Sequence, residues 1–250
     1  MTVREIVETL GLAADEDAVR KMAEYNAMVI AMSRKMNLTG IKDAEESLVK
    51  NIYDSLTVYE EKYFPKNGRM LDLGTGAGFP GIPLAILRPD MQVVLVDSVL
   101  KKLVFIENAA AKLGIKNIKI LHIRAEEGGR RRKTRETFDM VTARAVKMLP
   151  VIAEWGIPFV KEGGIFAAMK GPGANEELRQ SGKILKELKR EDIYDWLNAF
   201  KADSLQRRGK PLANTSLYNA VHYISVFLNF CCKKNFILEN PVKSIFMPEV

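Results

Sequence analysis

Cysteine and histidine are scarce in this sequence of 250 residues, which contains two of each. The cysteines are adjacent, at Cys231 and Cys232, and the histidines stand alone at His122 and His222. Adjacent cysteines cannot staple a small fold, and these spacings cannot supply a four-ligand zinc site. We therefore expect no disulfide framework, no metal and a reducing, cytoplasmic location.

Long apolar runs are missing as well. No stretch of 18 apolar residues occurs, and acidic residues begin at Glu5, where a signal peptide would have its apolar segment. We expect a soluble protein that does not contact a membrane. Hydrophobic residues nevertheless make up 47% of the chain, which is enough for a sizeable core.

Acidic residues are outnumbered by basic ones. The 38 Lys and Arg exceed the 31 Asp and Glu, for a formal net charge of +7. The segment from Arg124 to Arg135 alone contains six basic and two acidic residues. This balance favours an anionic partner such as nucleic acid.

The hydrophobic pattern changes twice along the chain. Apolar residues recur at helical spacing up to about residue 64, short apolar runs then alternate with helical stretches, and a helical texture returns near residue 184. We predict N-terminal helices over 1–64, an α/β domain with a mostly parallel, Rossmann-like sheet over 65–183, and a small all-α segment over 184–250. The expected strands are 70–73, 92–96, 119–123, 140–142 and 165–169, and the expected helices between and after them are 80–87, 99–113, 146–160 and 175–188.

The most informative stretch runs from Met70 to Gly81, where an apolar strand leads into glycines and then a helix. Gly74, Gly76 and Gly78 permit positive φ and close approach of the backbone to a ligand, and the helix N-terminus offers free N–H groups. The pattern predicts a ligand site at this turn.

Two ligands fit the turn. Gly76, Gly78 and Gly81 spell the G-x-G-x-x-G of a dinucleotide site, so NAD remains an alternative. Asp72 before the glycines would repel a pyrophosphate but suits the cationic S-adenosylmethionine. Asp97, at the end of the next expected strand, can accept the ribose hydroxyls of either cofactor.

Several blocks of the first 180 residues together resemble the bacterial 16S rRNA guanine-N7 methyltransferases, the family also called glucose-inhibited division protein B. The matching blocks are Asn37 to Ile41, Asp54 to Leu56, Leu71 to Ile86, Val96 to Ser98, Arg124 to Glu126, Phe138 to Ala145, Lys161 to Gly164 and Met169 to Gly171. Asn51 departs from the family, which usually has histidine there.

The resemblance implies a class I methyltransferase that uses S-adenosylmethionine to methylate 16S rRNA, free or in the small ribosomal subunit. The cofactor residues that it implies are Gly74, Phe79, Ala125, Glu126 and Arg144, with Asp97 close by. Candidates for contact with the substrate RNA are Asn37, Thr39, Arg130, Arg131, Arg132, Lys133 and Lys170, together with Arg34, Lys35, Lys101 and Lys102.

Features that other methylation chemistries need are absent. Methylation of cytosine C5 needs a cysteine nucleophile, and the two cysteines lie far downstream in a helical pattern. Methylation of an exocyclic amine typically uses an Asn/Asp-Pro-Pro-aromatic turn, whereas the fourth strand here ends in Thr142-Ala-Arg-Ala145. Guanine N7 has a lone pair and no proton, so it needs no general base, and we assign no catalytic residue.

Residues 184–250 depart from that family, whose members end in a β-hairpin. They resemble part of the helical core-binding domain of tyrosine recombinases and phage integrases, in the stretches Asp192 to Leu197, Gly209 to Tyr218, Ile224 to Phe230 and Phe236 to Pro241. The alternative function is therefore an inactive cofactor-binding domain fused to a DNA-binding module. Since a helical pattern stands where the family has its last strands, we expect cofactor binding to survive more readily than turnover.

Overall fold

The computed structural model describes residues 1–145 and 147–171 and the single positions 173, 174, 177, 198, 202 and 205. Residues 1–171 form one compact unit and residues 172–250 a second. The predicted N-terminal helices and the predicted α/β region up to residue 171 thus share the first unit, whereas residues 172–183 of that predicted region belong to the second. The predicted helix over 175–188 and the recombinase-like segment over 184–250 lie outside the described residues, apart from those single positions.

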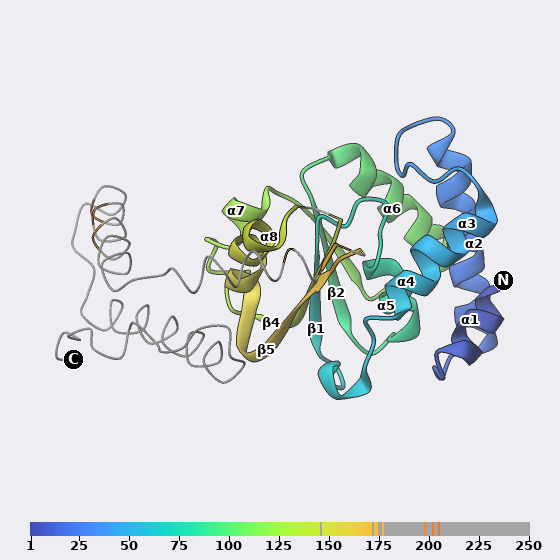
Figure 1. The fold of residues 1–250 in the computed structure, drawn as a ribbon, viewed down its shortest axis with the longest axis horizontal. Coiled ribbons are helices and arrows are strands. Elements are labelled where there is room, and N and C mark those ends of the chain that lie inside the picture. The colour runs from blue at the N-terminus through green and yellow to red at the C-terminus, as the bar shows by residue number, and fades with distance from the viewer. Residues whose placement is uncertain are drawn as a thin grey trace. The chain divides into compact units, whose positions relative to one another are not determined.

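The first unit begins with helices and continues as alternating strands and helices (Figure 1). The elements, in chain order, are α1 (Val3–Thr9), α2 (Glu16–Ser33), α3 (Ala44–Ser47), the π-helix η1 (Leu48–Tyr53), α4 (Asp54–Leu56), η2 (Glu61–Tyr63), β1 (Arg69–Leu73), α5 (Gly81–Leu87), β2 (Gln92–Asp97), α6 (Leu100–Leu113), β3 (Ile118–His122), α7 (Ala125–Gly128), β4 (Phe138–Arg144), α8 (Leu149–Gly156), η3 (Ile157–Phe159) and β5 (Val160–Met169).

The five strands form one parallel sheet in the order β3-β2-β1-β4-β5. From β1 the chain winds outward through β2 to β3, then returns to the other side of β1 for β4 and β5. The strand order therefore reverses between β1 and β4. In open α/β sheets, the carboxyl ends of the strands at such a reversal border the ligand-binding crevice.

Side chains that alternate along the strands supply two apolar layers. Met70 and Leu95 face a core that includes residues of α1, α2, η1, α5 and α6, whereas Leu71, Val94 and Val141 face a smaller core completed by Ile152 and Phe159. This period of two is expected for strands buried on both faces. The N-terminal helices thus pack against the sheet as part of the larger core.

The five predicted strands are confirmed, with boundaries that differ by up to five residues. The largest difference is at β5, which begins at Val160 where we predicted the end of a helix. Gly163, within the added part of the strand, takes a positive φ of 75° next to an irregularity in the pairing of β5 with β4.

Among the described residues, no helix is both long enough and apolar enough to span a lipid bilayer.

Candidate functional site

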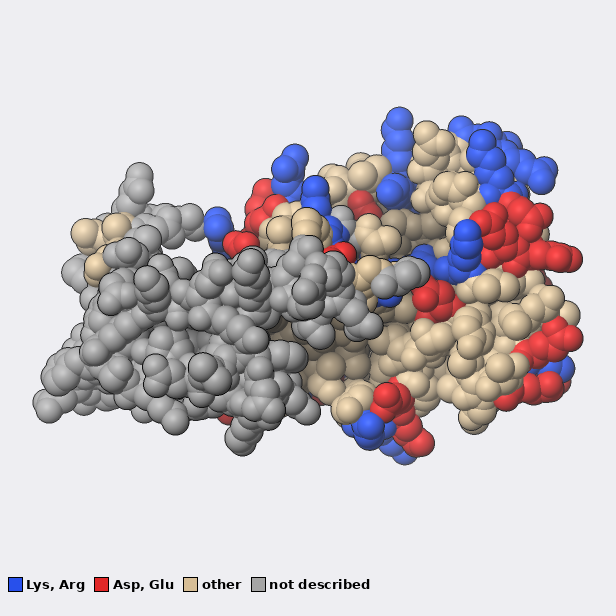
Figure 2. All heavy atoms as spheres, viewed as in Figure 1, with Lys and Arg blue, Asp and Glu red and all other residues tan. Residues whose placement is uncertain are grey.

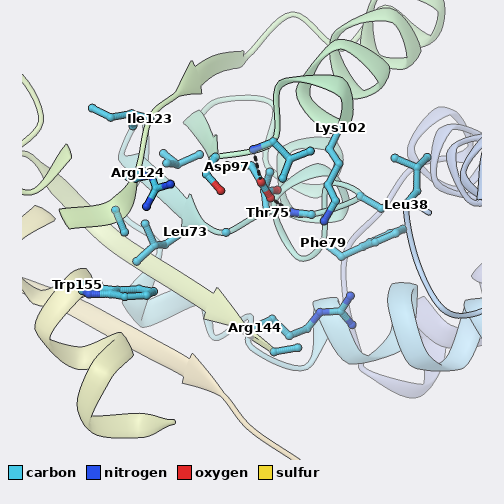
Figure 3. Close-up of a pocket in the computed structure, with 18 of the residues that line it drawn as sticks. Leu38, Leu73, Thr75, Phe79, Asp97, Lys102, Ile123, Arg124, Arg144 and Trp155 are labelled. Carbon is cyan, nitrogen blue, oxygen red and sulfur yellow. Dashed lines mark hydrogen bonds between the residues drawn. The ribbon is translucent and has the colours of Figure 1, made fainter. Parts of the chain in front are cut away.

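A cavity of about 530 Å³ opens at the carboxyl ends of β1, β2 and β4, where the strand order reverses. Seven of the nine predicted cofactor residues line it: Gly74, Gly76, Phe79, Asp97, Ala125, Glu126 and Arg144. Figure 3 shows Asp97 and Thr75 in the middle of the view, with Ile123 and Trp155 on one side. Phe79 and Leu38 lie on the other side.

The loop after β1 is shaped by its glycines. Gly74 and Gly76 have φ of 69° and 59°, values that side chains rarely tolerate. Among the described residues, a Cβ on Gly76 would meet only the Gly74 carbonyl oxygen, at 3.9 Å, so packing within this part of the chain does not explain this glycine. The open face of the loop is instead available to a ligand.

Asp97 joins the end of β2 to this loop. One carboxylate oxygen accepts a hydrogen bond from Gly76 N at 2.9 Å, and the other accepts from Val99 N at 2.8 Å. The residue is 8% exposed and lines the cavity. Since each carboxylate oxygen has a further lone pair, Asp97 can support the loop and accept hydroxyl groups of a ligand at the same time.

Asp72, which we predicted to contact the cofactor, does not line the cavity. It is fully buried beneath the loop, where Oδ2 accepts from Thr75 Oγ1 (2.6 Å) and Gly81 N (3.0 Å) and Oδ1 accepts from Thr142 Oγ1 (3.0 Å). Burial raises the pKa of Asp72, although these three hydrogen bonds act in the opposite direction. The side chain supports the loop from inside the protein.

Asp72→Asn tests whether its charge or its hydrogen bonds matter. An amide oxygen in place of Oδ2 can accept from Thr75 and Gly81, and the amide nitrogen can donate to Thr142 Oγ1. We expect stability within about 1 kcal/mol of wild type and wild-type affinity for S-adenosylhomocysteine, measured by urea unfolding and isothermal titration. Because the pKa of Asp72 is raised in the folded protein, the free energy of unfolding of wild type should fall relative to that of the variant as the pH rises above the ordinary Asp range. A large loss of affinity in a folded variant would show that the charge itself acts on the ligand.

Gly78, the other predicted residue outside the cavity wall, is explained by packing. Its φ is 87°, and a Cβ there would collide with Tyr25 Oη and come within 2.8 Å of Ile82 Cγ1. Tyr25 of α2 is fully buried, and its hydroxyl donates to the Ala77 carbonyl at 2.8 Å. Helix α2 therefore supports the loop on its buried side through Tyr25, a role that helical periodicity alone did not reveal.

Arg144 ends β4 at the cavity and is fixed by the N-terminal helices. Its Nη1 donates to Lys50 O (2.6 Å) and to Asp54 Oδ2 (2.9 Å), and its Nη2 donates to Asn51 Oδ1 (2.9 Å). The guanidinium carbon also lies 5.6 Å from the centroid of the Phe79 ring. Strand β4 and the segment from Lys50 to Asp54 thus meet at one cationic group.

The far end of the cavity combines Ala125 and Glu126 with an aromatic side chain. Ala125 and Glu126 begin the short helix α7, directly after β3. Trp155 of α8 also lines this end, and sequence reasoning missed it because an aromatic residue on a helix usually indicates core packing. Its position after β4 was the only signal in the sequence.

The predicted RNA residues fall in several places. Thr39 lines the cavity, as does Lys102, whereas Asn37 is exposed outside it. Lys170 donates to the Lys147 carbonyl at 2.6 Å, outside the cavity wall. The exposed run is Arg130, Arg131, Arg132 and Lys133, which follows Glu126 after only a few residues.

A rigid base supports this basic run. Gly128 and Gly129 are buried so closely that a Cβ on each would meet Phe159 at 2.8 Å and Pro158 at 3.0 Å, respectively. Thr134 closes the turn by donating to the Gly128 carbonyl at 2.6 Å. In Figure 2, several Lys and Arg side chains lie along the upper edge of the view, over the region where Figure 1 shows α7 and α6.

The residues of the cavity fit S-adenosylmethionine. The cofactor has ribose hydroxyls, which suit the Asp97 carboxylate, a carboxylate, which suits Arg144, and an adenine, which suits the apolar end beside Ile123 and Trp155. The open loop at Gly76 leaves space for the close approach of a ligand.

The sheet order, the glycine loop after β1 and the carboxylate at the end of β2 together define a class I S-adenosylmethionine-dependent methyltransferase fold. Residues 18–194 match the model of the GidB family, described as rRNA small subunit methyltransferase G. The chain belongs to this family.

Curated relatives agree with the family match. The chain is 40% identical over 179 residues to the ribosomal RNA small subunit methyltransferase G of Clostridium perfringens, covering 72% of this chain and 75% of that protein. It is 40% identical over 190 residues to the protein of the same name from Leuconostoc mesenteroides, covering 74% and 80%. Among solved structures, it is similar to an O-methyltransferase from Thermotoga maritima, with 18% identity, a TM-score of 0.42 and coverage of 63% and 56%, a likeness too low to add to the assignment.

The recombinase resemblance receives no support from these comparisons. The family match ends at residue 194, so it includes the first residues of the segment that we predicted to be recombinase-like. The stretches from Gly209 onward lie outside the match and, apart from the single positions named above, the whole segment lies outside the described residues.

Proposed function

We propose that the chain transfers the methyl group of S-adenosylmethionine to N7 of a guanine in 16S ribosomal RNA, in the cytoplasm. The proposal rests chiefly on one observation, the convergence of the glycine loop, Asp97 and Arg144 on a single cavity at the reversal of the strand order. Membership of the rRNA small subunit methyltransferase G family supports the RNA substrate.

The proposed cofactor residues divide by chemistry. Asp97 accepts the ribose hydroxyls, Ala125 and Glu126 lie at the adenine end, and Phe79 and Arg144 form the opposite end with the loop at Gly74 and Gly76. Bound S-adenosylmethionine supplies an electrophilic methyl group on a sulfonium. The protein binds and orients the reactants, which for well-aligned groups lowers the barrier by about 7–11 kcal/mol.

The ionisable groups of the cavity wall are compatible with an N7 nucleophile. The wall contains Asp97, Glu126, Lys102, Arg124 and Arg144, and no His or Cys among the described residues. Guanine N7 has no proton to remove, so orientation and electrostatics are sufficient. Because N7 faces the deep, narrow major groove of A-form RNA, the base has to be presented unpaired or flipped into the cavity.

The basic run from Arg130 to Lys133 is proposed to bind RNA phosphates beside the cavity. All four side chains are exposed, and none forms an ion pair with another described residue. Their short separation from Glu126 places phosphate contacts next to the adenine end of the cofactor site. DNA contact through the C-terminal segment remains a separate proposal without a supporting observation in the described residues.

Replacing Arg130, Arg131 and Arg132 with glutamine tests the proposed binding of phosphates. We expect a smaller dependence of RNA affinity on salt, by about 0.7 in the log–log slope for each phosphate that the variant no longer neutralises, and unchanged affinity for S-adenosylhomocysteine. The matched control replaces three lysines with glutamine, at Lys112, Lys116 and Lys119. These side chains are exposed around the start of β3, whereas the cavity lies at the carboxyl ends of the strands. Equal slopes for the two triple variants would contradict the assignment.

Calorimetric titration of the full chain with S-adenosylmethionine and with NAD tests the cofactor. We expect binding of the former and none of the latter, because the chain belongs to a family of methyltransferases. Binding of NAD alone would replace the methyltransferase proposal with that of a dinucleotide-dependent enzyme.

A further inference from the structure

A row of buried polar side chains runs from the N-terminal helices to the cavity. Asn26 Nδ2 donates to Ala44 O (3.2 Å), Ser47 Oγ donates to Asn26 Oδ1 (2.6 Å), and Asn51 Nδ2 donates to Ser47 Oγ (2.9 Å). The row ends at Arg144, whose Nη2 donates to Asn51 Oδ1 at 2.9 Å. Asn26, Ser47 and Asn51 are at most 3% exposed, so solvent does not compete for these bonds.

The direction of every bond in this row is fixed from its two ends. The Ala44 carbonyl can only accept, and the Arg144 guanidinium can only donate. The amide oxygen of Asn51 must therefore face Arg144, and the amide nitrogen of Asn26 must face Ala44. Reversal of either amide would oppose two donors or two acceptors, so the row has a single satisfied arrangement.

Asp54 begins α4, whereas Lys50 and Asn51 lie in the π-helix η1, which brings Asn51 to the cavity wall. Segments of this kind are rare and recur at functional sites. Lys50 O, Asn51 Oδ1 and Asp54 Oδ2 hold three of the five N–H groups of the guanidinium. Among the described residues, the Nε–H and one hydrogen of Nη2 have no acceptor, and the side chain lines the cavity.

Nε and Nη2 are adjacent nitrogens of the kind that bind a carboxylate side-on. The amino-acid end of S-adenosylmethionine carries the only carboxylate of that cofactor. We propose that Asn51 is a positioning residue which, with Ser47 and Asn26, holds Arg144 so that Nε and Nη2 bind this carboxylate. The inference rests on the proposed function and adds a polar connection from helix α2 to the cofactor.

Titration of two ligands separates positioning from general stability. S-adenosylhomocysteine contains the carboxylate, and 5′-methylthioadenosine lacks the whole amino-acid end. Asn51→Leu preserves the size of the side chain and removes the acceptor for Arg144. We expect it to lower the affinity for S-adenosylhomocysteine about 10-fold and to leave the affinity for 5′-methylthioadenosine unchanged.

A second pair of variants tests the row beyond Asn51. Ser47→Ala keeps the contact between Asn51 and Arg144 but removes the hydrogen bond that orients the Asn51 amide. We therefore expect the affinity for S-adenosylhomocysteine to fall about 3-fold and the affinity for 5′-methylthioadenosine to stay unchanged. Ser33→Ala is the matched control, because that hydroxyl is also buried but has no hydrogen-bond partner among the described residues. If Asn51→Leu does not fold, the serine pair provides the test.

Three results would overturn the inference. The first is that Asn51→Leu binds S-adenosylhomocysteine with wild-type affinity, or that Ser47→Ala does so if Asn51→Leu does not fold. Either result would exclude the positioning role. An equal loss for both ligands would make that role purely structural. Unchanged binding of S-adenosylhomocysteine with a raised KM for rRNA would assign Arg144 to the RNA. If the wild-type chain binds neither ligand, the proposed function itself fails.

Discussion

Asp97→Ala is expected to weaken the binding of S-adenosylhomocysteine about 100-fold, or about 2.7 kcal/mol. The variant removes a carboxylate whose two oxygens hold Gly76 N and Val99 N and remain available to ribose hydroxyls. Hydrogen bonds to a charged group contribute about 1.5–3 kcal/mol each, so the loss of one or two explains this magnitude. Isothermal titration of the purified full chain measures the effect.

Asp90→Ala is the matched control for this variant. Asp90 is also a carboxylate that accepts from a backbone N–H, at Asn67, and it precedes β2, whereas Asp97 ends that strand. The ion pair with Arg88 lowers the pKa of Asp90, so removing this carboxylate reduces the stability of the fold at neutral pH. Asp90 lies at the opposite end of β2 from the cavity, so its removal should not affect ligand binding. Affinity of Asp97→Ala within 3-fold of wild type, or an equal loss in Asp90→Ala, would contradict the ribose role.

Gly81→Ala is expected to destabilise the fold by about 3 kcal/mol and to impair cofactor binding. The new Cβ would collide with Leu95 Cδ2 and lie 2.8 Å from Asp72 Oδ2, where side chains of the core have no space to retreat. Displacement of Asp72 would also break its bond to Gly81 N, which joins the loop to the start of α5. Urea unfolding and titration with S-adenosylhomocysteine measure the two effects.

Gly171→Ala serves as its control, since a Cβ there would meet no described residue within 4 Å. We expect that variant to match wild type in both stability and affinity. If Gly81→Ala has the same urea midpoint of unfolding as wild type, the close packing around Asp72 is not required for stability.

Local sequence determined most of the sheet and the loop. The strands from Met70 and from Gln92 are continuous apolar runs, and the glycines after the first mark a turn that needs positive φ. These signals involve neighbouring residues, so they can be interpreted without the fold. The same reasoning placed Asp97 and Arg144 at strand ends, where the cavity lies.

Contacts between distant segments were beyond such reasoning. Tyr25 contacts the cofactor loop, and Asn51 contacts Arg144, only because the N-terminal helices pack beside the sheet. Asp72 was interpreted as a ligand group because its charge was visible in the sequence and its three buried donors were not. The π-helix around Asn51 has no periodic signature that could have indicated it.

The most direct test of the proposed function is to incubate the full chain with S-adenosylmethionine labelled in its methyl group and small ribosomal subunits that lack the modification. Digestion of the 16S rRNA and separation of its nucleosides then locate the label. We predict that the label appears in N7-methylguanosine. Label in another nucleoside, or none despite measured binding of S-adenosylhomocysteine, would contradict the proposed function.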